Sequence, residues 1–150
     1  MKQFFILLTV LAFSTVSRAQ TTEDSVKTVV NNLFAAMIKS DTVLLRTCFA
    51  DSMVLQTIVR GQSGGAEVKS ETAEGFVKSI GSLKPGSADE RITIGNVLID
   101  GPLALVWTPY KFYFNGQFSH CGVNSFHLVR FKDGWRIQYL IDTRRRVNCE

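Results

Sequence analysis

The chain has 150 residues, of which 45% are apolar, 11% aromatic and 20% charged. This length and composition are typical of one globular domain, and they exclude both a two-domain protein and an intrinsically disordered chain. The formal net charge is +4, and two of the positive charges, Lys2 and Arg18, belong to an N-terminal segment with a pattern of its own.

That N-terminal segment has the pattern of a secretory signal peptide. Lys2 gives a basic start, residues 4–13 are almost wholly apolar, and Ser17 and Ala19 put small residues where a signal peptidase requires them. The apolar run is well short of the ~20 residues of a membrane-spanning helix, which argues against a membrane anchor. We therefore expect a signal peptide at 1–19, a domain at 20–150, and export to the periplasm or out of the cell.

Helical periodicity follows. Apolar residues recur at spacings of three and four from Val26 to Ile38, which predicts an amphipathic helix. Asp41 is a suitable N-cap for a second, short helix, and residues 53–59 are expected to form a short strand.

Residues 60–69 are rich in glycine and serine, and this composition predicts a surface loop. The stretch is not a phosphate loop, because no Gly-Lys-Ser/Thr ending follows its glycines. Residues 70–83 carry apolar side chains at helical spacing, so we expect a third helix that stops at Lys84-Pro85-Gly86.

The second half of the chain predicts an antiparallel sheet. Its β-rich runs are separated by Asp-Gly, Asn-Gly and Asp-Gly, which are strong signals for two-residue hairpin turns. Helices followed by a sheet indicate an α+β fold, with the helices packed on one face of a curved sheet. The expected strands cover 92–99, 103–114, 118–131 and 135–143.

Two-residue turns at 100–101, 115–116 and 133–134 would fix the register and assign each side chain to a face. One face would be apolar and would pack against the helices, with a polar row inside it. Buried amides and hydroxyls need hydrogen-bond partners, so we take this row as the wall of a ligand pocket. The expected pocket residues are Trp107, Tyr113, His120, Asn124, Phe126, Tyr139 and Thr143.

The opposite face would be mixed in character, which suits a homodimer interface through the sheet. It would gather Ser125, His127 and Asp142 in one patch. We do not assign a hydrolase triad there, because a flat strand face lacks the nucleophile elbow and the oxyanion donors. Asp142 would point away from the pocket unless a β-bulge shifts it.

Three cysteines follow the signal segment, and at most one intramolecular disulfide can form among them. The predicted register brings Cys121 close to Cys149 if the last strand continues past Arg146, so these two are the candidate pair. Cys48 is expected to be a lone structural thiol. No Cys-x-x-Cys pair and no spacing of His and acidic residues is typical of a metal site, and we expect neither a metal nor a cofactor.

Basic residues gather near the C-terminus. Arg144, Arg145 and Arg146 would lie beside Arg130 and Lys132, and such a cluster could attract an anion or a nucleic acid. A solvated strand end is the simpler interpretation. Export and the assignment of the aromatic residues to the core both argue against nucleic acid.

Two segments are distinctive, Gly122-Val123-Asn124-Ser125-Phe126-His127-Leu128-Val129-Arg130 and Asp133-Gly134-Trp135-Arg136-Ile137. With the helical first half and the sheet they resemble the nuclear-transport-factor-2-like (NTF2-like) superfamily, within it the exported, so-called lumazine-binding and SnoaL-like branch. The resemblance spans 26–145. It implies a cone-shaped, cystatin-like α+β fold, a hydrophobic cavity between helices and sheet, and usually a homodimer.

Three functions of different classes follow. The first is binding of a small apolar or aromatic ligand in the cone. The second is an isomerase, cyclase or dehydratase, since the resemblance implies an Asp or His base inside the cone. His120 would then be the acid/base, because its charge changes near neutral pH, with Asp142 as the alternative and Tyr113 and Asn124 as hydrogen-bond partners. The third is a structural dimerisation module with a filled cone.

Overall fold

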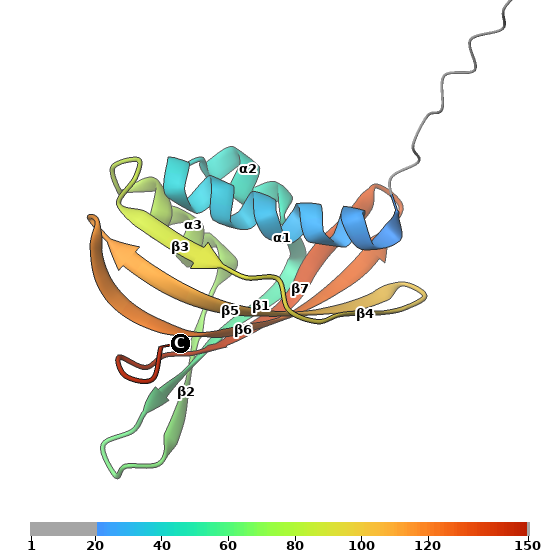
Figure 1. Ribbon diagram of the computed structural model, residues 1–150. Helices are drawn as coiled ribbons and strands as arrows, with labels where there is room; N and C mark the ends of the chain where they lie inside the picture. Colours follow the sequence, from blue (N-terminus) through green and yellow to red (C-terminus); the bar gives the residue numbers. More distant parts are fainter. Residues whose placement is uncertain (1–20, 150) are drawn as a thin grey trace, which may run out of the picture.

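The computed structural model describes residues 21–149, and the predicted signal peptide lies outside them (Figure 1). The α+β fold is confirmed, with three helices packed on one face of a curved sheet (Figure 1). The elements are α1 (Thr22–Lys39), α2 (Thr42–Thr47), β1 (Phe49–Arg60), β2 (Ala66–Glu71), α3 (Ala73–Gly81), β3 (Ala88–Ile92), β4 (Val97–Asp100), β5 (Leu103–Phe114), β6 (Gln117–Phe131) and β7 (Gly134–Thr143).

The first helix forms where the periodicity predicts it. The hydroxyl of Thr21 accepts a hydrogen bond from the backbone of Asp24 at 3.1 Å, and the Asp24 carboxylate accepts one from the backbone of Thr21, which together make a capping box. The helix ends at Ser40, whose φ of 53° is left-handed. Asp41 caps α2 as expected, because its carboxylate accepts from the backbone of Val43 and Leu44.

The sheet is mixed, and this differs from the expected antiparallel meander of four strands. Its order is β2-β1-β7-β6-β5-β3, with β4 paired to the remaining part of β5. β1 pairs with β7 in parallel, and the other strand pairs are antiparallel. A parallel pair needs a long crossover, which the chain between β1 and β7 supplies.

The expected surface loop at 60–69 is confirmed only for residues 61–65, because the chain then returns as the edge strand β2. β2 pairs with β1, for example Val68 with Ile58, and every residue of β2 is exposed. A strand without a buried face shows no apolar alternation, so the sequence does not reveal it. The third helix begins later than expected, at Ala73, because the Thr72 hydroxyl caps the backbone N–H of Gly75 at 3.0 Å.

A β-bulge changes the faces of β5. The Asn115-Gly116 turn forms as predicted and pairs Phe114 with Gln117. Ser119 is then the extra residue, so Phe112 pairs with His120 and the register of the rest of the hairpin moves by one. A shift of one residue exchanges the two faces. The residues that pack toward the helices are therefore Ala104, Val106, Thr108 and Tyr110, and not Leu103, Leu105 and Trp107.

A second bulge lies at Gln138 in β7, between the pairs Leu128 with Ile137 and His127 with Tyr139. It places Asp142 opposite Asn124, on the face that carries the helices. The expected patch of Ser125, His127 and Asp142 is therefore wrong, because the bulge moves Asp142 to the other face.

The predicted strand 92–99 is correct only at its ends, because β3 stops at Ile92 and β4 begins at Val97. β3 and β4 both pair with β5, and the chain between them leaves the regular ladder. The core is completed by edge-to-face packing of Phe34 on Phe126, with ring centroids 6.0 Å apart. Over residues 21–149, no helix combines the length and the apolar character that crossing a bilayer requires.

Candidate functional site

A small cavity of about 60 Å³ lies between α1, α3 and the sheet face that carries the helices. This is about the volume of two water molecules. One side of its wall is apolar and the other is polar. The apolar residues are Leu33, Phe34, Met37, Leu55, Phe76 and Leu140, and the polar residues are Thr57, Glu71, Glu90, Asn124, Asp142 and Arg144.

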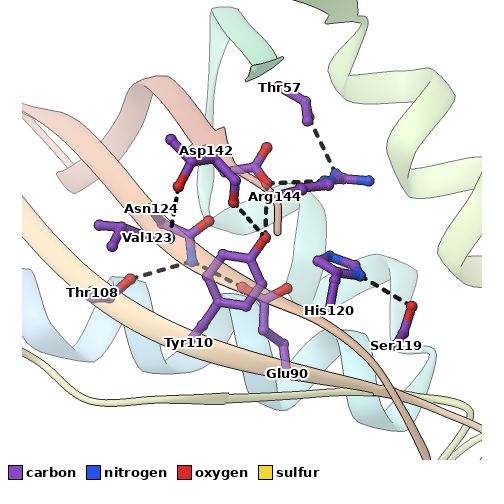
Figure 2. Close-up of polar contacts among 11 residues, drawn as sticks. Thr57, Glu90, Thr108, Tyr110, Ser119, His120, Val123, Asn124, Asp142 and Arg144 are labelled. Carbon is purple, nitrogen blue, oxygen red and sulfur yellow. Dashed lines mark hydrogen bonds and ion pairs between the residues drawn. The ribbon is translucent and has the colours of Figure 1, made fainter. Parts of the chain in front are cut away.

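Glu90 is the most unusual residue of this wall. It lies on β3 and faces inward, because Ala88, Glu90 and Ile92 alternate with the more exposed Arg91. The Asn124 side-chain amide donates to Glu90 Oε1 at 2.8 Å and also contacts Thr108 Oγ1 at 3.3 Å (Figure 2). Burial raises the pKa of the Glu90 carboxyl to about 7, and this hydrogen bond from Asn124 opposes the rise.

The second oxygen of this carboxyl is available to a ligand. Within residues 21–149, Glu90 Oε2 has no hydrogen-bond partner. Unlike Ser40 Oγ, which is fully buried without a partner, Glu90 Oε2 keeps some accessible surface. Glu90 is partly accessible and lines the cavity.

Asp142 forms the centre of a second group of contacts. Its Oδ2 accepts from the Tyr110 hydroxyl at 2.9 Å and from Arg144 Nε at 3.0 Å (Figure 2). Arg144 Nη2 in turn donates to Thr57 Oγ1 at 3.1 Å, so the guanidinium bridges β7 and β1. Asp142 is buried, whereas the Arg144 side chain is half exposed. The ion pair thus closes one side of the cavity.

Tyr110 reaches this carboxylate because Gly122 lies beneath its ring. A Cβ at Gly122 would overlap the carbonyl oxygen of Thr143 and would lie 2.9 Å from the Tyr110 ring. The same hydroxyl lies 3.0 Å from the Thr143 carbonyl oxygen. Burial, followed by the nearby carboxylates of Asp142 and Glu90, raises the pKa of Tyr110, so the phenol stays protonated as a donor.

Two of the three carboxyl groups that line the cavity, those of Glu90 and Asp142, lie in different surroundings. Burial raises the pKa of Glu90, on the polar side of the cavity, to about 7, whereas Asp142 is ion-paired with Arg144. Such a difference assigns distinct roles to two acids of one site, with Glu90 suited to proton transfer.

Two of the residues singled out in the sequence line the cavity, Asn124 and Asp142. His120 does not, although it lies on the same sheet face. Its ring packs between Tyr110, at 5.7 Å, and Phe112, at 5.0 Å, and its Nδ1 lies 3.0 Å from Ser119 Oγ. Burial, followed by the charge of Arg144, lowers the pKa of His120.

The other expected pocket residues lie elsewhere, and the two bulges are the main reason. Trp107 is on the opposite face and 45% exposed, and Tyr113 is there too, beneath the Arg91 guanidinium. Tyr139 donates to Gln56 Oε1 at 2.7 Å and packs on His127. Phe126 is on the predicted face but is buried in the core.

The sequence predicts that Thr143 presents its side chain to the pocket, but this residue does not line the cavity. Its Oγ1 instead accepts from the backbone N–H of Val123 at 3.2 Å. Only its carbonyl oxygen approaches the site, through Tyr110. The bulge at Gln138 again explains the difference, because it turns Asp142, and not Thr143, toward the cavity.

Glu90 and Tyr110 are site residues that the sequence pattern did not reveal, and Arg144 was expected only in a basic cluster at a solvated strand end. β3 has the sequence Ala-Asp-Glu-Arg-Ile, and three successive charges hide its alternation. The available signal was the spacing of Ala88, Glu90 and Ile92, which predicts an acidic side chain on an inward face.

The cysteines have separate roles. Cys121 and Cys149 form a disulfide with a Cα–Cα distance of 5.7 Å, and it ties the C-terminal segment to β6. Cys48 is buried beneath α2, and burial raises the pKa of its thiol to about 11. A thiol with a raised pKa is a poor nucleophile, so Cys48 is a packing residue.

A wider groove of about 560 Å³ lies between α3 and β1 and is lined by Arg46, Asp51 and Glu74 among others. Arg46 and Glu74 pair with one another at 2.6 Å and both are half exposed or more. Because this groove presents solvated charges and the small cavity presents Glu90, the cavity is the better candidate site.

No family model matches the chain, and no curated protein sequence is significantly similar to it. Many solved structures share its fold. An NTF2-like protein of unknown function from Shewanella baltica has 13% identity and a TM-score of 0.62, and the match covers 81% of this chain and 91% of that one. A cystatin-like domain from Nostoc punctiforme has 14% identity and a TM-score of 0.65, covering 87% and 82%.

A candidate dehydratase of the NTF2-like family from Streptomyces avermitilis is also similar, with 17% identity, a TM-score of 0.60, and coverage of 82% of this chain and 95% of that one. Together these structures show that the chain has the NTF2-like, cystatin-like fold, as its sequence motifs indicated.

Proposed function

We propose that the cone cavity binds a small, largely apolar molecule and that Glu90 transfers a proton on it, as in an isomerase, cyclase or dehydratase. The observation that carries this proposal is the Glu90 carboxyl, which lines the cavity, has a pKa raised by burial to about 7 and keeps Oε2 without a partner among the described residues. A group that titrates near the working pH is effective both as acid and as base.

The neighbouring residues support this assignment. Asn124 holds Oε1 in place, so that Oε2 is directed to the ligand. Arg144 is the positive group of the cavity wall, and its Nη1 has no hydrogen-bond partner within the described part of the chain. Arg144 would therefore stabilise negative charge on a ligand oxygen as the proton is removed.

The cavity volume limits what can reach Glu90. About 60 Å³ admits only a few non-hydrogen atoms, such as a carbonyl or hydroxyl group with its adjacent carbon. Glu71 and Arg144 are exposed and also line the cavity, so its mouth lies on their side. The rest of the ligand would occupy this mouth.

Native mass spectrometry of the protein purified without added ligand is the first test. A bound molecule that is released on denaturation would identify the ligand class by its mass. Turnover is then measured for wild type, Glu90→Gln and the control Glu67→Gln, whose carboxylate is exposed on β2. We expect Glu90→Gln to lose at least ~100-fold in rate, as is usual for removal of a general acid or base.

The control should retain the wild-type rate. Equal turnover by Glu90→Gln would refute the role of this carboxyl. A ligand that binds but is not converted by wild type would support binding in the cone and contradict the enzymatic step.

We also propose that the protein is exported and forms a homodimer through the sheet face opposite the helices. The Cys121–Cys149 disulfide supports an oxidising compartment. Leu103 and Trp107 leave large apolar side chains exposed on this face, 47% and 45% respectively, which supports an interface. Sedimentation analysis of wild type and Trp107→Lys tests the dimer. If wild type and variant both sediment as monomers, the proposed dimer is contradicted.

A further inference from the structure

Four residues form a row across neighbouring segments of the sheet. Arg91 on β3 lies opposite Lys111 on β5, Lys111 lies opposite Cys121 on β6, and Cys121 bridges to Arg145 after β7. Residues that are directly opposite share a face. The row therefore presents three cationic side chains on the sheet face that points away from the cone.

This row lines a groove of about 340 Å³. The Cys121–Cys149 disulfide forms part of the groove wall and holds the C-terminal segment that carries Arg145. Backbone hydrogen bonds between Cys121 and Arg145, both 2.9 Å, hold the same segment. No carboxylate is among the residues that line the groove within the described chain.

The charges of the row are only partly compensated. Arg91 pairs with Asp89 at 2.8 Å and its guanidinium lies 4.2 Å from the centre of the Tyr113 ring, which holds the side chain in place. Lys111 and Arg145 form no ion pair with any residue from 21 to 149. Like charges directly opposite on neighbouring strands destabilise a sheet. A bound anion would remove this repulsion.

We propose that this groove is a binding site for a small molecule with two or more oxyanion groups, carboxylates or phosphates. Neighbouring strands are about 4.8 Å apart, so Lys111 and Arg145 originate roughly 10 Å from one another, on either side of the disulfide. A di- or trianion can place one oxyanion group against each of these cations, whereas a singly charged ion offers only one group. Arg and Lys together suit such groups, because Arg forms paired hydrogen bonds to oxyanions and Lys adds a mobile point charge.

The site lies on the opposite face from Glu90 and does not rest on the function proposed for the cone. Its ligand is recognised by charge, whereas the cone takes a largely apolar molecule. Failure of either proposal therefore leaves the other unaffected.

Isothermal titration calorimetry at low ionic strength tests the proposal, with citrate and tripolyphosphate as multivalent probes and acetate as the singly charged comparison. The test variant is the double substitution Lys111→Gln and Arg145→Gln. The matched control is Arg130→Gln with Lys132→Gln, which removes the same charge from exposed positions at the other end of the sheet.

We expect the wild type and the control variant to bind at least one multivalent probe and to show no binding of acetate. The test variant should bind about 100-fold more weakly, because each charge-assisted hydrogen bond that the substitutions remove weakens binding about tenfold. Tighter binding of tripolyphosphate would assign phosphate as the natural group, and tighter binding of citrate would assign carboxylate. Equal affinities of test and control variants, or no binding by wild type up to ~10 mM, would overturn the proposal.

An NMR titration of the wild-type protein keeps the test independent of variant folding. Binding at the row should shift the amide signals of Arg91, Lys111 and Arg145 and leave those of Arg130 and Lys132 in place. Shifts spread over all exposed cations would overturn a specific site.

Discussion

Replacing Glu90 with Gln should make the protein more stable at neutral and alkaline pH. The folded protein holds the Glu90 proton more tightly than the unfolded chain, since burial raises the pKa from 4.5 to about 7. Between these values the folded state binds more protons than the unfolded state, so wild-type stability falls as the pH rises. At about 1.4 kcal/mol for each pH unit, the accumulated loss is about 3 kcal/mol above pH 7.

Gln keeps the shape of the side chain and the oxygen that accepts from Asn124, but it does not titrate. Variant and wild type should therefore have similar unfolding free energies below pH 4.5, where both side chains are neutral. Above pH 7, the unfolding free energy of the variant should exceed that of wild type by about 3 kcal/mol. This difference in unfolding free energy is the stability that the site gives up to keep a buried carboxyl.

Urea unfolding at a series of pH values, followed by tryptophan fluorescence, measures the effect. The quantity to plot against pH is the difference in unfolding free energy between variant and wild type. Other titrating groups, such as His120, contribute equally to both proteins, so their contributions cancel in this difference. Glu67→Gln provides an exposed comparison and should show no trend. A difference between Glu90→Gln and wild type that does not change with pH would refute a raised pKa at Glu90.

Three further substitutions test the geometry by unfolding in urea. Tyr110→Phe removes the hydroxyl that donates to a buried carboxylate and should cost about 1–3 kcal/mol, and no loss would contradict that bond. Gly122→Ala, whose Cβ would overlap the Thr143 carbonyl oxygen, should cost about 3 kcal/mol or more, whereas Gly65→Ala, with nothing nearby, should stay within about 0.5 kcal/mol. Trp107→Ala should cost less than about 1 kcal/mol in the monomer, and a loss of ~3–5 kcal/mol would mean that this side chain is buried.

The elements whose signal is local could be predicted from the sequence. The apolar spacing from Val26 to Ile38 specifies α1, because it needs only a helix of 3.6 residues per turn. Asp41 caps α2, and Asn115-Gly116 forms the hairpin turn, because each acts on its immediate neighbours. These local signals, in their order along the chain, were sufficient to predict the α+β class.

The membership of the site could not be predicted in the same way. The sequence pattern places Asn124 in the pocket but assigns it the wrong strand partner, since Thr108 and not Trp107 lies opposite it. Glu90 lies on a short, charged strand whose place beside β5 becomes apparent only when the sheet is assembled. Its raised pKa results from burial by the surrounding elements and has no counterpart in the strand's own sequence.

The amino-acid sequence by itself determined the helices, the Asn115-Gly116 turn and the fold class, because these depend on periodicity and on contacts within a few residues. The other two turns lie one residue away from the predicted positions, at 101–102 and at 132–133, because Asp100 pairs with Leu103 and Phe131 pairs with Gly134. Tertiary structure decided which side chains face the cone. Each bulge, at Ser119 and at Gln138, inserts one residue in a ladder whose side chains alternate with a period of two, so every residue beyond it changes face. For that reason Tyr110 and Asp142 meet inside the protein, while Trp107 lies on its surface.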